Sequence, residues 1–140
     1  MSNKGLVIHA WVIMTNHVHM VIARNGEIPL QHIMRDMKKF TSVKVIQSIE
    51  KSKVESRREW MIKIFAAYGT ANSNNVKYQF WQQDNHPIEL NSNKEIEQKL
   101  EYIHENPVGH GFTNTSECYN WSSAIDYSDG KGLVKIETLF

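Results

Sequence analysis

The feature that most constrains the fold is the stretch 6–22, which is almost entirely apolar and rich in β-branched residues. Short runs of this composition favour strands over a helix. The polar pair Thr15-Asn16 divides the stretch, which predicts two paired strands. Side chains alternate between the faces of a strand, so His17 and His19 are expected on the same side of the sheet. Two adjacent imidazoles on a rigid sheet suit a divalent metal ion, although such pairs also occur in sheets that bind nothing.

The length of 140 residues predicts one domain, residues 1–140, with a single hydrophobic core. Cys118 is the only cysteine, which excludes a disulfide framework and a cysteine metal cluster within the chain. No segment has the apolar length of a membrane span, and the first residues lack a secretory pattern. These features predict a soluble, cytoplasmic protein without a membrane partner.

Charge is distributed unevenly along the chain. Residues 1–80 hold twelve Lys and Arg against five Asp and Glu, whereas residues 81–140 hold four against ten. The basic residues concentrate between Arg35 and Lys63, where they are typical either of solvated helix faces or of a surface that contacts a nucleic-acid backbone.

Several further elements follow from periodicity and from residues that begin or end helices. Apolar residues at helical spacing predict a helix from Pro29 to about Ile49. A second helix is expected over 54–68 with Gly69 as its C-terminal cap, followed by a loop over 70–75. A short aromatic strand is expected over 78–82, a short helix near 121–127, and a last strand over 133–136.

The best-defined predicted helix begins at Ser92, which forms a capping box with Glu95, and ends at Asn106-Pro107 because the residue before a proline disfavours helical geometry. Tyr102 lies roughly 120° from the apolar stripe of this helix and one turn before Asn106. A tyrosine in this position is often an ordinary surface residue. A phenol can also act as a nucleophile, and an amide oxygen could complete a metal site with the two histidines.

Three motifs together resemble the single-tyrosine HUH transposases, specifically the REP-associated tyrosine transposases of the IS200-like family. The motifs are Trp11–His19, the tryptophan-glutamine block Phe80–Ile88, and Tyr102–Val108, in that order. The resemblance covers about Leu6 to Tyr127. It implies an α+β fold: a ferredoxin-like antiparallel sheet with helices on one face.

The resemblance further implies a nickase that cleaves and rejoins single-stranded, hairpin-associated DNA with Mg²⁺ or Mn²⁺. Its intermediate would be a covalent 5′-phosphotyrosine on Tyr102, with His17, His19 and Asn106 as metal ligands. His104 and Glu105 are alternative ligands that their spacing from Tyr102 disfavours. Such a protein would be associated with the nucleoid. The residues expected to contact DNA are Arg35, Lys38, Lys39, Arg57, Arg58, Trp81, Gln82 and His86.

Compared with the family that it resembles, the chain is expected to lack the usual first strand and helix before the histidine strand, or to have them in shortened form. The loss of a strand would expose backbone that a partner chain could cover, which raises the possibility of a homodimer. Three alternatives remain: a domesticated or truncated non-catalytic protein that binds DNA hairpins, a replication initiator or relaxase, and a metal-dependent hydrolase in which water attacks.

Overall fold

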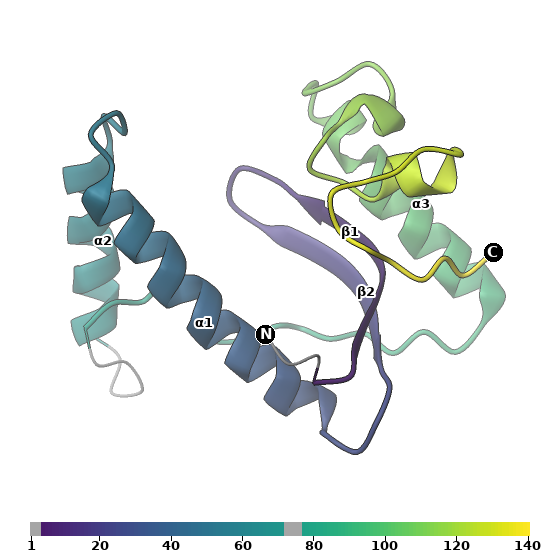
Figure 1. Cartoon of the computed structure of the whole chain (residues 1–140), viewed down its shortest axis with the longest axis horizontal. Helices are drawn as coiled ribbons and strands as arrows, with labels where there is room; N and C mark the ends of the chain where they lie inside the picture. Colours follow the sequence, from purple (N-terminus) through teal and green to yellow (C-terminus); the bar gives the residue numbers. More distant parts are fainter. Residues whose placement is uncertain (1–3, 72–76) are drawn as a thin grey trace. The chain divides into compact units, whose positions relative to one another are not determined.

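The computed structural model describes residues 4–71 and 77–140 (Figure 1). Its described part contains a two-stranded antiparallel sheet and three α-helices, which confirms the predicted α+β class. The chain forms two compact units: one joins the residues up to Leu30 with Ile88–Phe140, and the other comprises Gln31–Pro87. None of the described helices is long and apolar enough to cross a membrane.

Strands β1 (Leu6–Ile13) and β2 (Val18–Arg24) form the hairpin that the sequence predicts. The break falls at residues 14–17, where the Met14 amide donates to the His17 carbonyl over 2.9 Å. Val12 pairs with His19 in the antiparallel register, and His9 forms a bulge between Ile8 and Ala10. The pairing therefore fixes His19 opposite Val12, in the buried C-terminal part of β1.

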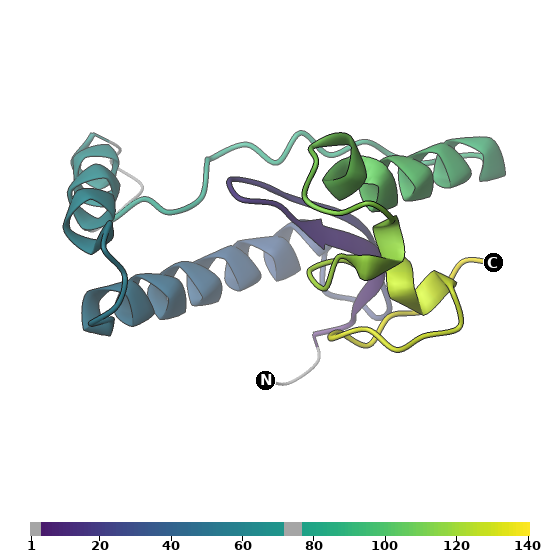
Figure 2. The same ribbon diagram turned by 90° about the horizontal axis from the view of Figure 1, so that it is seen from above.

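The second edge of β1 is covered by the C-terminal part of the same chain, drawn in green and yellow in Figure 2. The Ile13 amide donates to the Trp121 carbonyl over 2.8 Å, and the Ser123 amide donates to the Trp11 carbonyl over 2.9 Å. Further along, the Glu137 amide donates to the Ile8 carbonyl over 2.9 Å. These contacts give hydrogen-bond partners to backbone groups at the open edge of β1. From the sequence, a partner chain was the expected source of such partners.

Helix α3 (Asn93–Gly109) packs against β1 to form the core of this unit. Leu100 and Ile103 lie on the buried face of the helix, in a cluster with Ala10, Val12 and Met14. The expected capping box is present. Ser92 Oγ accepts from the Glu95 amide, and the Glu95 carboxylate accepts from the Asn91 amide and the Ser92 hydroxyl. The start and the buried stripe of α3 are thus confirmed.

The predicted end of this helix at Asn106-Pro107 is wrong, because α3 continues through Pro107 to Gly109. A proline in the last turn removes only one helical hydrogen bond, and the buried Pro107 ring adds packing. Two hydrogen bonds end the helix: the His110 amide donates to the Asn106 carbonyl, and the Phe112 amide donates to the Pro107 carbonyl. Gly111 adopts a φ of 73° in this closure, a conformation that suits glycine.

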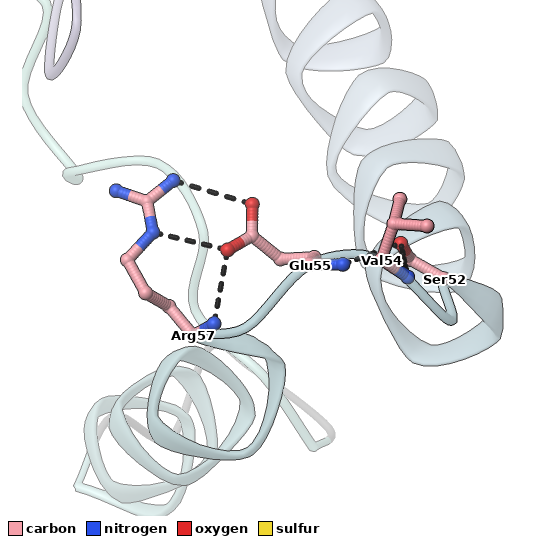
Figure 3. Close-up of polar contacts among 4 residues, drawn as sticks. All are labelled: Ser52, Val54, Glu55 and Arg57. Carbon is pink, nitrogen blue, oxygen red and sulfur yellow. Dashed lines mark hydrogen bonds and ion pairs between the residues drawn. The ribbon is translucent and has the colours of Figure 1, made fainter.

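In the second unit, α1 (Leu30–Lys51) and α2 (Arg58–Thr70) are joined by a short connection (Figure 3). Ser52 Oγ accepts from the amides of Val54 and Glu55, and the Glu55 carboxylate accepts from the Arg57 backbone and guanidinium. These side-chain contacts stabilise a turn, so α2 begins at Arg58 rather than at 54.

Two predicted strands, over 78–82 and 133–136, are wrong, since neither of these fully described runs forms a strand. The first run is attached to the helices of its unit through one backbone hydrogen bond, from the Gln79 amide to the Phe65 carbonyl over 2.9 Å, and through side chains. The Tyr78 hydroxyl donates to Glu50 over 2.9 Å, and Trp81 Nε1 donates to Thr41 Oγ1 over 2.9 Å. The expected short helix near 121–127 is present as a 3₁₀-helix, η2 (Ala124–Tyr127), and a second 3₁₀-helix, η1, spans Ser116–Cys118.

Gly69 is not the C-terminal cap of α2, because the helix runs to Thr70 and is capped by Ala71. Gly69 is buried where the backbone of Lys77 and Tyr78 crosses the helix. A Cβ atom here would collide with the Lys77 carbonyl oxygen and lie 2.7 Å from its carbonyl carbon. The position therefore requires glycine for close backbone approach. Most of the predicted loop over 70–75 lies outside the described residues.

Gly69→Ala should destabilise the second unit, because the added methyl group meets backbone that cannot rotate away. We expect a loss of about 1–3 kcal/mol in thermal or urea unfolding. Gly109→Ala is the matched control, since a Cβ atom at Gly109 has no neighbour within 4 Å. Equal stability of Gly69→Ala and wild type would contradict this packing.

Candidate active site

His17 and His19 lie together at the start of β2. Their ring centroids are 4.8 Å apart, with the planes at 70°. His17 Nδ1 lies 2.6 Å from Asn16 Oδ1, and this acceptor favours a proton on Nδ1 of His17. In a neutral ring, this tautomer leaves the lone pair on Nε2, the nitrogen that is then available to a metal.

The electrostatic surroundings favour the neutral form of His19. Burial lowers its pKa below the usual value, and the neighbouring His17 and Lys99 lower it further. A neutral ring retains the lone pair that a metal ligand needs. The site therefore presents its second imidazole in the ligand form near neutral pH.

Helix α3 places Tyr102 beside this pair, although 83 residues separate it from His19. The Tyr102 hydroxyl lies 3.4 Å from His19 Nε2, and the two ring centroids are 5.2 Å apart. A separation of 3.4 Å is at the long end for a hydrogen bond, so neither group is held firmly by the other. Tyr102 is 51% exposed and accessible to a large substrate.

Asn106 follows Tyr102 by one turn of α3 and is 7% exposed. Its side-chain oxygen Oδ1 is buried and makes no hydrogen bond with any described residue. An unsatisfied buried oxygen costs about 1–3 kcal/mol, so it normally has a partner. An amide oxygen is also a suitable ligand for Mg²⁺ or Mn²⁺.

The donor types present, two imidazoles and one amide oxygen, suit a divalent cation by their chemistry. Among the described residues, no three His, Cys, Asp or Glu side chains form a metal-binding group. The two alternative ligands lie elsewhere on α3: Glu105 is exposed, and His104 contacts the C-terminal segment.

His104 links α3 to β1 through a residue that no sequence pattern singles out. His104 Nε2 lies 3.0 Å from the Oγ of Ser123, a fully buried serine that also accepts from the Trp11 amide over 2.9 Å. The His104 ring packs on Tyr127 with centroids 5.0 Å apart. Burial lowers the pKa of His104, despite the opposing effects of Glu105 and Asp126.

All eight residues predicted to contact DNA lie in the second unit, where four of the basic side chains have partners within that unit. Lys38 donates to the Gln82 carbonyl over 2.6 Å and to Asn85, and Arg58 donates to the Ser52 carbonyl over 2.9 Å. Arg35 and Arg57 pair with the carboxylates of Asp36 and Glu55, each over 3.0 Å.

Lys39, Gln82 and His86 are exposed, whereas Trp81 is partly buried between Thr41 and Phe80. The structure also exposes Trp60 on α2 by 62%, an aromatic side chain that the sequence pattern did not distinguish from core residues.

The N-terminal part of the chain matches a known protein family. The model of the family "Transposase IS200 like" matches residues 1–76, just over half of the chain. The protein therefore belongs to the IS200-like transposase family, which confirms the family expected from the three motifs. The matched region contains the histidine pair and ends before Tyr102 and Asn106. No curated protein and no solved structure matches the chain.

Acidification should weaken the link between α3 and β1. The pKa of His104 is lower in the folded protein than its ordinary value of about 6.5, so the fold favours the neutral ring. This contribution to stability is present above about pH 6.5 and is lost as the pH falls through the lowered pKa.

The measurement is the melting temperature at pH 8 and pH 5. His104→Gln should show a smaller drop than wild type, and His32→Gln, on the exposed face of α1, serves as the control for loss of a histidine. An unchanged drop in His104→Gln would show that this ring does not contribute to the pH dependence.

Proposed function

We propose that this member of the transposase family cleaves and rejoins single-stranded, hairpin-associated DNA through a covalent 5′-phosphotyrosine on Tyr102. The observation that carries the proposal is the 3.4 Å approach of the Tyr102 hydroxyl to His19 of the histidine pair. Neither group is close to the other in the sequence, and both belong to the motifs that resemble the tyrosine transposases.

In the proposed reaction, the Tyr102 oxygen attacks the phosphorus atom of a phosphodiester. The bond from phosphorus to the 3′ oxygen breaks, and that oxygen leaves as a 3′ hydroxyl after it takes up a proton. The phenolic proton passes to solvent, which reaches the half-exposed Tyr102. Attack by a 3′ hydroxyl on the phosphotyrosine reverses these steps and rejoins DNA without an external energy source.

His17, His19 and Asn106 would hold a divalent cation, Mg²⁺ or Mn²⁺, beside Tyr102. Such a cation supplies Lewis-acid polarisation of the phosphate oxygens. The buried Oδ1 of Asn106 supports this assignment, because a cation would give that oxygen a partner. The hydrogen bond between His17 Nδ1 and Asn16 Oδ1 also supports this assignment, because it orients the ring and leaves Nε2 for the cation.

The second unit is proposed to bind the DNA. Its 57 residues, 31–87, carry ten Lys and Arg against five Asp and Glu, and the exposed Lys39 makes no ion pair with a described residue. Arg35, Lys38, Arg57 and Arg58 would contact phosphates by exchanging their present partners. Trp81, Gln82 and His86 are proposed to contact bases, with stacking by the aromatic ring.

Tyr102→Phe should abolish covalent attachment to DNA while leaving DNA binding intact. The phenyl ring keeps the packing against His19 but lacks the attacking oxygen. The measurement is a denaturing gel of protein incubated with 3′-labelled hairpin DNA and Mn²⁺, with a chelator control. Turnover that persists in Tyr102→Phe would indicate attack by water, and binding without cleavage by wild type would indicate a non-catalytic hairpin-binding protein.

Mn²⁺ should raise the melting temperature of the wild type, because a ligand of the folded state stabilises it by mass action. His19→Gln and Asn106→Leu should lose this response. Asn106→Leu should keep a metal-free stability close to that of wild type, because it removes an oxygen that has no partner. His32→Gln should respond like wild type, and a full Mn²⁺ response in Asn106→Leu would exclude Asn106 as a ligand.

A further inference from the structure

Lys99 lies on α3 one turn before Tyr102 and extends over its ring. The Lys99 Nζ atom is 5.6 Å from the centroid of the Tyr102 ring. Its charge also reaches the histidine pair, since it contributes to the lowered pKa of His19. An ammonium group therefore stands beside the phenol and an imidazole that the proposed function uses.

No described carboxylate neutralises this ammonium. The nearest acidic residue one turn earlier, Glu95, is engaged at the helix cap, where its Oε2 atom accepts from the Asn91 amide over 2.9 Å and from the Ser92 hydroxyl over 3.0 Å. Lys99 itself makes no ion pair with a described residue. The neighbours of this cation are thus the Tyr102 ring and the His19 imidazole, an arrangement that favours an incoming anion.

We propose that Lys99 is a further catalytic residue that binds a non-bridging oxygen of the DNA phosphate attacked by Tyr102. This proposal rests on the proposed function. As the phenolic oxygen bonds to phosphorus and the 3′ oxygen departs, negative charge spreads over the equatorial phosphate oxygens. The ammonium of Lys99 stabilises that charge by a charge-assisted hydrogen bond and keeps its proton throughout.

The competing explanation is that Lys99 only packs on Tyr102 as an i, i+3 pair. Lys99→Met separates the two roles, because it keeps an unbranched apolar stem over the ring and removes the charge. Lys99→Arg keeps the charge. Lys94→Met, at an exposed position in the first turn of the same helix, controls for the change in net charge.

The experiment measures the single-turnover rate of adduct formation on a 3′-labelled library of single-stranded hairpins with randomised flanks, in Mn²⁺. Lys99→Met should react on the order of 100-fold more slowly, the effect typical of losing one donor to a developing oxyanion. Lys99→Arg should recover most of the rate, and Lys94→Met should stay within about twofold of wild type. Affinity for the same DNA, measured in a Tyr102→Phe background, should change much less than the rate.

Three results would overturn the proposal in distinguishable ways. If wild type and Lys99→Met form the adduct at equal rates, Lys99 has no catalytic role and the proposed function stands. If wild type forms no adduct with any member of the library, the proposed function fails and the role of Lys99 fails with it. A slow Lys99→Met that melts like wild type, together with an equally slow Lys99→Arg, would also exclude charge stabilisation by Lys99.

Discussion

The packing of α3 against β1 is the interaction on which the candidate site depends. Leu100 and Ile103 enter the cluster formed by the buried side chains of β1, and this contact fixes both the height and the rotation of the helix. Tyr102 is adjacent in sequence to Ile103, so its orientation follows from the burial of its neighbour. The Tyr102 hydroxyl consequently lies beside His19 of β2, a contact that requires the helix to pack on the sheet.

The C-terminal segment makes this arrangement rigid. Ser123 is bound to the Trp11 backbone and to His104, so a single buried hydroxyl connects β1 with the tyrosine helix. Tyr127 adds a hydrogen bond to the His9 carbonyl at the bulge. The C-terminal segment thus covers the open edge of β1 and also contacts the helix that carries Tyr102. The stability of the unit is therefore coupled to the geometry of the site.

The chemistry of the site depends on separating neutral from charged groups. Burial lowers the pKa of His19, whereas Lys99 lies over the Tyr102 ring and makes no ion pair with a described carboxylate. In the second unit, by contrast, a cationic side chain does have a carboxylate partner. Arg57 pairs with Glu55 and lowers the pKa of that carboxyl. Exposed pairs of this kind contribute little to stability, so DNA phosphates could replace the carboxylates at small cost.

Local pattern in the sequence determined the strand pair, the placement of His17 and His19 on one side of the sheet, the Ser92 cap and the one-turn spacing of Tyr102 and Asn106. Each of these depends on backbone periodicity or on nearby hydrogen bonds. The sequence motifs also indicated the family. Only the tertiary structure decided that Tyr102 meets His19 and that Ser123 secures the helix. It also decided that 78–82 packs against the helices of its unit instead of forming a strand, and that α3 passes through Pro107. These features depend on which distant surfaces pack together, and packing between distant segments overrides local preference.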